Sequence, residues 1–266
     1  MSEKLEVLLS CMNFQDKGFL NRHNFQSDVL IINQTDRTAY EEFSFSDKNG
    51  AVHKARMLSI QQRGLSQSRN LAIDYAQGDI LLIADDDENF VNSYPSLILN
   101  SFNQSPKSDV ILFNVKTNKL NNDLPNRAAK VGYIRAMKAC SLQIAFRRSS
   151  IREKGIRFDV TMGAGTNNGG GEENKFLFDC LKHKLCVTYT PKLIAHVDDH
   201  SSSTWFNGYD KEFFINRGYS SRKLLGIFLG CLYVFEWSIL KYPRYKKDMS
   251  FAKSLIFQMK GLFFKP

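Results

Sequence analysis

The sequence lacks several patterns that would assign it to common classes of protein. Its five cysteines are widely scattered, with no CxxC pair and no Cys/His cluster, so neither a zinc site nor a disulfide framework is indicated. The first 13 residues open with charged side chains and show neither the apolar segment nor the cleavage site of a secretion signal. We therefore expect a protein of the reducing cytoplasm.

Further absences narrow the choice of activity. Residues 10–20, which follow the first predicted strand, hold no glycine-rich phosphate loop of the kind expected in a nucleotidyltransferase. The glycines between residues 163 and 171 come late in the chain and do not follow a first strand, so they are weak support for dinucleotide binding. There is no internal repeat and no recognisable nucleic-acid-binding module.

Charge is distributed very unevenly along the chain. The 266 residues carry a net charge of +9, which is compatible with nucleic acid, anionic lipid or a polyanionic substrate as a partner. Residues 217–266 alone contain ten Lys or Arg and two acidic residues, so nearly all of the excess lies in the last fifth of the chain. Without a nucleic-acid module, we expect no nucleic-acid partner and favour an anionic membrane surface.

The C-terminal segment is apolar as well as basic. Residues 224–240 are apolar apart from Glu236 and Ser238, and this run is shorter than the roughly 20 residues of a spanning helix. Tyr233, Trp237 and the flanking basic residues are typical of a membrane interface. Three interpretations stay open: helices packed on the domain, a true span, and peripheral attachment to the inner face of the cell membrane, which we favour for residues 221–266.

The centre of the chain holds the most informative stretch, residues 64–90. Apolar residues at helical spacing predict a helix from Leu65 to Ala76, with Ser66 or Ser68 as N-cap and Gly78 as a left-handed stop. A buried strand is expected at residues 80–84, as in parallel sheets covered on both faces.

Three acidic residues, Asp85, Asp86 and Asp87, follow that strand directly. Ligands of open α/β sheets bind at this edge, and adjacent carboxylates repel one another unless a cation or hydrogen bonds compensate them. A solvated acidic turn is the alternative, but the preceding buried strand favours a metal site.

The remaining elements alternate between strand and helix. We expect strands at 5–10, 29–32, 43–45, 55–60, 110–115, 142–147, 186–189 (ended by Pro191) and 193–197, helices at 94–103 and 175–183, a short element at 151–155, and a polar loop at 118–127. This order predicts an α/β fold with a mostly parallel, Rossmann-like sheet flanked by helices, and a C-terminal helical appendage.

Other polar residues are candidates for chemistry. Glu172 and Glu173 end the glycine-rich loop just before a helix, where they either cap the helix or belong to a mobile loop that brings a carboxylate to substrate. His196 and His200 flank two acids and would suit manganese or magnesium, although a histidine after a strand is more often a structural hydrogen-bonding residue. Arg69 and Asn70 point toward phosphates or lie on the surface.

Taken together, these features resemble glycosyltransferase family 2, whose members have the GT-A fold. The segments that carry the resemblance are residues 65–72 (LSQSRNLA), 78–87 (GDILLIADDD) and 171–177 (GEENKFL). It extends over about residues 5–220. It implies a GT-A domain at 1–220, with a nucleotide-sugar half at 1–115 and an acceptor half at 116–220.

The resemblance also implies roles for individual residues. Asp85 would face the ribose, and Asp87 would bind the Mn²⁺ or Mg²⁺ that bridges the diphosphate. Glu173 would be the catalytic base beside Glu172, and His196 would complete the metal site, with His200 as the alternative. The nucleotide-sugar site would further include the residues Ser10, Asn33, Arg69, Asn70 and Asp86.

Two departures from the family pattern concern the nucleotide base. The first strand ends Ser10-Cys11-Met12-Asn13 where Pro-x-Tyr-Asn is more usual, and the second strand ends with Asn33 where an aspartate that reads uracil is more typical. The resemblance therefore leaves the base and the donor sugar open.

The function that follows from the resemblance is that of an inverting, hexosyltransferase-like enzyme. It would move a sugar from a nucleotide-diphosphate sugar to a glycan or polyprenyl-linked acceptor, as in capsule or O-antigen polysaccharide assembly. A metal ion would neutralise the leaving diphosphate and a base would take the acceptor proton. The alternatives are a magnesium-dependent nucleotidyltransferase-like enzyme and a non-catalytic, membrane-associated nucleotide-sugar-binding module.

Overall fold

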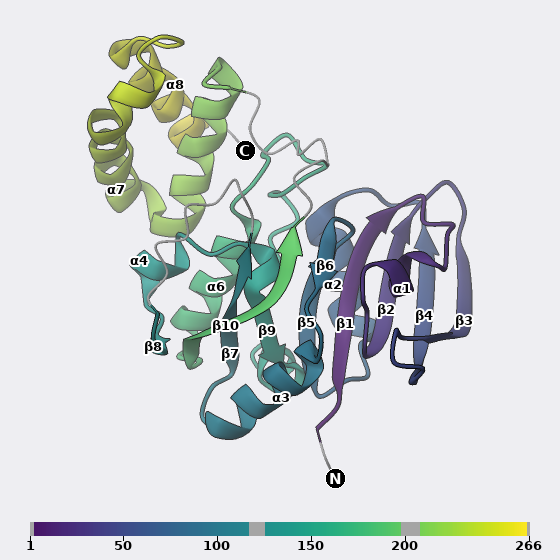
Figure 1. Cartoon of the computed structure of the whole chain (residues 1–266). Coiled ribbons are helices and arrows are strands. Elements are labelled where there is room, and N and C mark those ends of the chain that lie inside the picture. The colour runs from purple at the N-terminus through teal and green to yellow at the C-terminus, as the bar shows by residue number, and fades with distance from the viewer. Residues whose placement is uncertain (1–2, 117–125, 198–207, 265–266) are drawn as a thin grey trace.

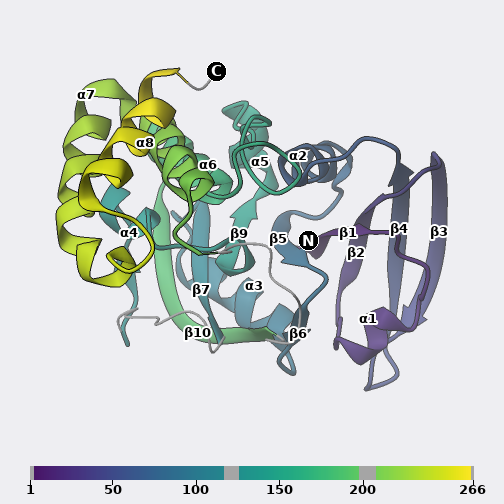
Figure 2. The same ribbon diagram turned by 90° about the horizontal axis from the view of Figure 1, so that it is seen from above.

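A ten-stranded sheet forms the centre of the structure, with helices on both of its faces and a helical segment at the C-terminal end (Figures 1 and 2). The structure is a computed structural model and describes residues 3–116, 126–197 and 208–264. The strand order is β3-β4-β2-β1-β5-β9-β7-β10-β6, and β8 pairs with β10.

The strands are β1 (Leu5–Met12), β2 (Asp28–Gln34), β3 (Ala39–Ser46), β4 (Val52–Ile60), β5 (Ile80–Asp85), β6 (Glu88–Phe90), β7 (Val110–Lys116), β8 (Ala129–Lys130), β9 (Ile144–Arg147) and β10 (Val187–Val197). The α-helices are α1 (Phe19–Arg22), α2 (Leu65–Tyr75), α3 (Tyr94–Gln104), α4 (Tyr133–Ala136), α5 (Arg148–Glu153), α6 (Glu172–Lys182), α7 (Lys211–Tyr245) and α8 (Phe251–Phe264).

Most of these strands run in one direction. β4, β2, β1 and β5 pair in parallel, as do β7 and β10. Because β9 is antiparallel to both β5 and β7, the β7–β10 pair runs the same way as β5. The predicted mostly parallel α/β sheet is confirmed, with β3, β6, β8 and β9 running against it.

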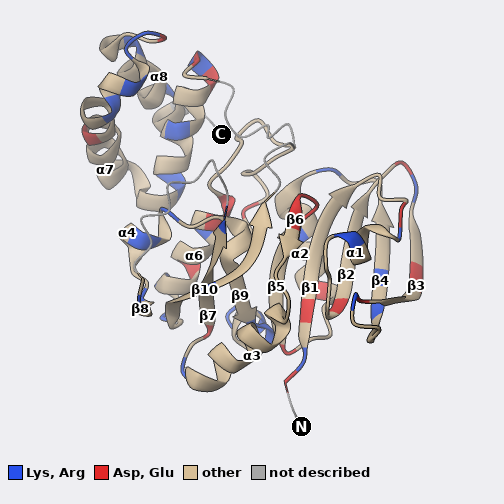
Figure 3. Ribbon diagram, viewed as in Figure 1, with Lys and Arg blue, Asp and Glu red and all other residues tan. Residues whose placement is uncertain are grey.

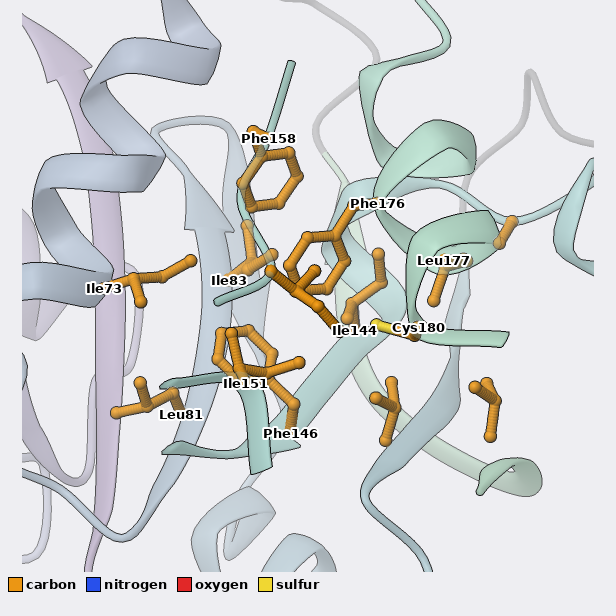
Figure 4. Close-up of a cluster of buried hydrophobic side chains, with 14 of the residues drawn as sticks. Ile73, Leu81, Ile83, Ile144, Phe146, Ile151, Phe158, Phe176, Leu177 and Cys180 are labelled. Carbon is orange, nitrogen blue, oxygen red and sulfur yellow. The ribbon is translucent and has the colours of Figure 1, made fainter. Parts of the chain in front are cut away.

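Alternation along the strands divides the core into two layers. Leu8 of β1 belongs to the cluster that packs against α2, α5 and α6, whereas its neighbours Val7 and Leu9 belong to the cluster against α1 and α3. Side chains of successive strand residues point to opposite faces, so a strand covered on both sides reads as a continuous apolar run. Figure 4 shows the first cluster, in which Ile73 of α2 and Phe176 of α6 face strand residues such as Ile83.

The strand register brings the predicted donor-site residues to one edge of the sheet. Ser10 of β1 lies opposite Asp85 of β5, and Cys11 lies opposite Asn33 of β2. All three strands end at this edge because they are parallel and in close register. The carboxyl ends of parallel strands are where open α/β sheets bind ligands.

Helix α2 begins at Leu65 as predicted, but its capping residues differ from the prediction at both ends. Neither predicted serine caps the helix, since Ser66 Oγ donates to the Met162 carbonyl at 2.7 Å and Ser68 Oγ donates to Ser10 Oγ at 2.9 Å. Gly78 does not adopt the left-handed conformation. Glycine is required there because an added Cβ would lie 2.6 Å from the Cβ of Glu6.

Two expectations about strands also need correction. Pro191 was expected to end a strand, but β10 continues through it as one strand with a register shift against β7 between Tyr189 and Leu193. The irregularity accommodates a residue that has no N–H to donate. β6, which pairs with the end of β10, was not predicted because it is only three residues long. Most of the polar loop predicted at 118–127 lies outside the described residues.

The C-terminal helices form a bundle. α7 crosses the predicted domain boundary at 220/221 and breaks at Gly226, whose φ of 73° and ψ of −176° are not helical. The two pieces fold back on each other, since the rings of Phe214 and Tyr245 lie 5.1 Å apart and Arg217 donates to the hydroxyl of Tyr233 at 2.8 Å. By length and composition, α7 is the one helix among the described residues that could cross a membrane, but the break divides it into pieces of 15 and 19 residues.

Helix α8 packs very closely against α7. A Cβ added at Gly218 would lie 1.8 Å from the carbonyl oxygen of Gln258, and one added at Gly261 would lie 1.9 Å from that of Ile215. Gln258 Nε2 also donates to Ser238 Oγ at 2.8 Å. The predicted C-terminal helical appendage is confirmed, and much of its packing is internal to the bundle.

Candidate active site

Arg69 on α2 joins the two predicted acidic regions. Its Nη2 donates to both carboxylate oxygens of Asp85 at 3.0 and 3.1 Å, and its Nη1 donates to Glu172 Oε1 at 3.0 Å. Only 1% of the side chains of Arg69 and of Glu172 is exposed. Burial lowers the pKa of Arg69, but Asp85, Glu172 and Glu173 outweigh that effect and raise it. The guanidinium therefore stays charged and holds the end of β5 against the start of α6.

The orientation of Arg69 depends on the segment before the glycine-rich loop. Its guanidinium lies 5.5 Å from the ring of Phe158, which stacks on Phe176 at 4.4 Å. Asn70 binds the backbone of Phe158 on both sides, accepting from its N–H at 2.8 Å and donating to its carbonyl at 2.9 Å. Asn70 therefore holds in place the residue whose ring lies beside the Arg69 guanidinium. Donor binding by Asn70 stays a prediction.

Glu172 and Glu173 begin α6 rather than precede it, which extends the helix three residues beyond the prediction. Carboxylates in the first turn are stabilised by the helix macrodipole. Burial, and then the charge of Glu172, raise the pKa of Glu173 well above the usual value of a glutamate. The Oε2 atoms of both side chains are buried and have no hydrogen-bond partner among the described residues. A buried carboxyl with a free oxygen and a raised pKa is suited to accept a proton.

The glycine-rich loop packs closely around this pair. Gly163 has a φ of 99°, and an added Cβ would lie 3.1 Å from Glu172 Cδ. Gly165, with a φ of 83°, lies so near Gly64 that a Cβ would come within 3.1 Å of the Gly64 Cα atom. These two glycines are therefore required by backbone conformation and close approach. The loop mobility predicted from them is not tested by the structure.

Glu88, which was not among the predicted site residues, lies directly behind the aspartates. It is fully buried and its Oε1 accepts a bond from the Asp85 N–H at 3.4 Å. Burial, and then the charge of Asp85, raise the pKa of Glu88 well above that of a free glutamate. The sequence signal was the continuation of the acidic run into a fourth residue. Asp86, in contrast, is exposed, and nucleotide-sugar binding by Asp86 stays a prediction.

The structure describes two of the three predicted metal ligands, Asp87 and His196. Asp87 follows β5, and His196 is an exposed residue of β10 that lies opposite Asn89 of β6. His200 lies outside the described residues. Within residues 3–116, 126–197 and 208–264, no group of three His, Cys, Asp or Glu side chains is positioned to hold a metal ion. Metal binding by Asp87 with either histidine stays a prediction.

A polar pocket of about 590 Å³ lies at the ends of β1 and β2. It is lined by Asn13, Phe14, Gln15, Asn33, Thr35, Asp36 and Arg37. Asn33 is 2% exposed and binds the backbone of Phe14, whose N–H donates to Asn33 Oδ1 at 2.8 Å. Ser10 lies on the neighbouring strand β1, opposite the residue that precedes Asn33. It is buried and accepts a hydrogen bond from the Ser68 hydroxyl. Both residues shape this end of the sheet, and their direct contact with a nucleotide stays a prediction.

A second pocket, of about 380 Å³, lies between the glycine-rich loop and α7. Gly170, Gly171 and Glu172 form one wall, and α7 residues that include Asn216 and Arg217 form another. The loop is tied to α7 by an ion pair between Asp159 and Lys223 at 2.9 Å and by a hydrogen bond between the hydroxyls of Thr161 and Tyr219 at 2.7 Å. The bundle thus completes a cavity that Glu172 borders.

The solved structures that resemble this chain include several of TarS from S. aureus. The chain is similar to TarS residues 1–349 in complex with UDP-GlcNAc, with 14% identity, a TM-score of 0.61, and coverage of 92% of this chain and 74% of that one. The same TarS fragment with UDP gives 12% identity, a TM-score of 0.61, and coverage of 98% and 81%. A longer TarS chain gives 12% identity, a TM-score of 0.58, and coverage of 92% and 44%. These likenesses confirm the GT-A fold.

No curated protein sequence matches the chain. The model of Glycosyl transferase family 2, in contrast, matches residues 27–163. This segment includes Arg69 and the three aspartates that begin at the last residue of β5, and it ends before Glu172. Because the match spans 137 of the 266 residues, the chain belongs to glycosyltransferase family 2.

Proposed function

We propose that the protein is an inverting, hexosyltransferase-like enzyme that moves a sugar from a nucleoside-diphosphate sugar to a hydroxyl group of a glycan or lipid-linked acceptor. One observation carries the proposal: the buried guanidinium of Arg69 binds Asp85 and Glu172 at once, although these residues are 87 positions apart in the chain. The donor-side acids and the glutamate pair therefore border the same site.

In the proposed reaction, Glu173 takes the proton of the acceptor hydroxyl as that oxygen attacks the anomeric carbon. The bond to the diphosphate breaks in the same displacement, which inverts the anomeric centre. Burial raises the pKa of Glu173, and a carboxylate with a raised pKa is a stronger base than one in water. Arg69 and Glu172 act through Glu173 and Asp85 as positioning residues.

The donor would lie along the carboxyl ends of β1, β2 and β5. The 590 Å³ pocket at the ends of β1 and β2 is large enough for a nucleoside, and Asp85 lies one strand away from Ser10. The two TarS structures with UDP-GlcNAc and with UDP support a uridine nucleotide as the first donor to test. Because Asn33 replaces an acidic residue, other bases belong in the same screen.

The proposal includes Mn²⁺ or Mg²⁺, held by Asp87 together with His196 or His200 and the diphosphate. The acidic composition of the edge suits a hard cation, since Asp85, Asp86 and Asp87 are consecutive and carboxylate oxygens are ligands that Mg²⁺ and Mn²⁺ prefer. When bound, the cation would neutralise charge on the leaving diphosphate.

Replacing Asp87 by Ala is expected to abolish metal-dependent nucleotide binding. In a thermal-shift screen of nucleoside diphosphates and nucleotide sugars, wild-type protein should gain several degrees in Tm only with Mn²⁺ or Mg²⁺ present, and D87A should show no such gain. Asp74→Ala, which removes an acid exposed on α2, is the matched control. Equal metal-dependent shifts in wild type and D87A would exclude the role of Asp87.

We also propose that the C-terminal bundle attaches to an anionic membrane surface on the cytoplasmic side, where a polyprenyl-linked acceptor of capsule or O-antigen assembly would be available. Large apolar side chains are exposed along the second piece of α7 and on α8: Ile227, Phe228, Leu229, Leu232, Phe235, Ile239, Leu240, Ile256 and Phe263. Lys and Arg residues lie along the same helices (Figure 3). An apolar surface with basic residues around it is the combination that binds anionic lipid.

Membrane attachment is tested by replacing exposed apolar residues with serine. The triple variant F228S/L232S/L240S is expected to bind anionic vesicles at least roughly tenfold more weakly than wild type, because each buried Phe or Leu contributes about 1.5–3 kcal/mol. Ile134→Ser, at an even more exposed position on α4, is the control and should bind normally. Equal vesicle cosedimentation of the triple variant and wild type would exclude this surface.

A further inference from the structure

Arg217, on the first piece of α7, is a partly buried arginine without an acidic partner. Its Nη2 donates to the Tyr233 hydroxyl at 2.8 Å, and its guanidinium lies 3.7 Å from the ring centroid of Trp237. No ion pair links it to any carboxylate of the described residues. Its Nε atom is buried and has no hydrogen-bond partner there. One donor of a positively charged group therefore remains unsatisfied.

This arrangement is costly unless an anion is bound. Removing a guanidinium from water disfavours its charged form, and burial accordingly lowers the pKa of Arg217. The aromatic rings of Trp237 and Tyr233 offset part of that cost through cation–π attraction, but they accept no bond from Nε. A bound anion would offset the remainder, and the rings already fix the side chain in place.

Arg217 lines the 380 Å³ pocket whose opposite wall is formed by Gly170, Gly171 and Glu172. That volume lies within the roughly 300–1,000 Å³ of small-molecule sites. Because Glu172 belongs to the buried cluster around Arg69, the pocket opens from the proposed catalytic centre on the side of α7. It is a different cavity from the one at the ends of β1 and β2.

The carboxylates of this pocket do not neutralise Arg217. Glu172 is paired with Arg69 at 3.0 Å. Asp210 caps α7 by accepting a bond from the Phe213 N–H at 2.7 Å. Glu212 is exposed at the rim, where water screens its charge.

We propose that Arg217 binds a phosphate group of the acceptor, so that the acceptor of this enzyme is a phosphorylated molecule. The proposal rests on the glycosyl transfer proposed above and names the class of its acceptor. The planar donors of a guanidinium match the oxygens of a phosphate. The phosphate has two possible sources, the diphosphate of a lipid carrier and a phosphodiester within the acceptor chain itself.

Binding is measured by calorimetry with the full chain and a saturating nucleoside diphosphate, which fills the donor site. The probes are geranyl diphosphate for the lipid source and bis(glyceryl) phosphate for the phosphodiester source, each compared with its uncharged parent alcohol. We expect wild type to bind at least one phosphate probe and not the parent alcohol. The probe that binds identifies the source.

Variants of α7 test whether Arg217 is responsible. Arg217→Gln should weaken binding of that probe roughly tenfold to a hundredfold, as for loss of a charge-assisted hydrogen bond, and Arg217→Lys should weaken it less. Arg222→Gln removes the same charge from the same helix and should bind as wild type does. Failure of both probes to bind wild type, or equal binding by wild type and R217Q, would overturn the proposal.

Sugar-nucleotide hydrolysis by wild type, measured in parallel, separates the two proposals. If a phosphate probe binds through Arg217 but no nucleotide sugar is hydrolysed or transferred, the phosphate subsite stands and glycosyl transfer is wrong. If nucleotide sugar is hydrolysed and neither probe binds, only the phosphate subsite is wrong. If R217Q fails to fold, the comparison of each probe with its parent alcohol on wild type still tests whether the protein binds the phosphate group.

Discussion

Replacing Glu173 by Gln is expected to abolish sugar transfer while raising the melting temperature. Loss of a general base costs roughly 10²- to 10⁴-fold in rate. The stability gain follows from linkage. Because folding raises the pKa of Glu173, its protonated form contributes to the stability of the folded state. That contribution is fully present below the pKa of the unfolded state and is lost as the pH rises through the pKa of the folded state. Glutamine is neutral at every pH, so the gain in Tm should be larger at pH 8 than at pH 5.

The same pKa shift predicts the pH dependence of transfer. The base acts as a carboxylate, so the rate at saturating donor should rise with pH through a range above the ordinary titration of glutamate, which lies near pH 4.3. Initial rates with a nucleotide sugar and calorimetric Tm values at several pH values give both quantities. Glu153→Gln, at an exposed position of α5, is the neutral control.

Each result for E173Q excludes a specific alternative. Unchanged transfer would show that Glu173 is not the base. A lower Tm at pH 8 would show that its carboxylate is stabilised in the fold. Nucleotide-sugar binding by wild type without hydrolysis or transfer would leave the non-catalytic binding module as the function.

Replacing Arg69 by Met is expected to cost about 3–5 kcal/mol of unfolding free energy. Methionine fills much of the same space but leaves the carboxylates of Asp85 and Glu172 without their shared partner in a buried environment. Arg69→Lys keeps a charge but cannot donate to both residues with a planar fork, so it should recover only part of the loss. Urea denaturation at pH 7 measures both variants.

A second buried ion pair provides the control for Arg69. Arg56 donates to Glu6 at 2.6 Å on the sheet, away from the glutamates of α6. Arg56→Met should also destabilise the protein but keep metal-dependent nucleotide binding, whereas R69M should lose both. Adding Glu172→Gln to R69M should restore part of the stability by removing one unpaired charge. A urea midpoint for R69M equal to that of wild type would contradict the central role of this cluster.

Local patterns in the sequence determined the elements and their order. Short apolar runs fixed three strands, with three residues in β1 (Val7–Leu9), four in β2 (Val29–Ile32) and five in β5 (Ile80–Ala84), because a strand covered on both faces is apolar at consecutive positions. Helical spacing fixed α2, and the aspartates after β5 indicated the ligand edge. The apolar, basic composition of the last 46 residues predicted the C-terminal helices. Each of these signals lies within one short segment of chain.

Only the tertiary structure decided how distant segments meet. Arg69 reaches Glu172 across 103 positions, and Gly78 is a glycine because Glu6 lies against it. Gly226 turns one apparent helix into two that pack together, which places Arg217 against Trp237. None of these contacts leaves a periodic signal, because they depend on packing between elements and not on the spacing within one. The sequence by itself determined which groups are available for chemistry, and packing decided which of them share a site.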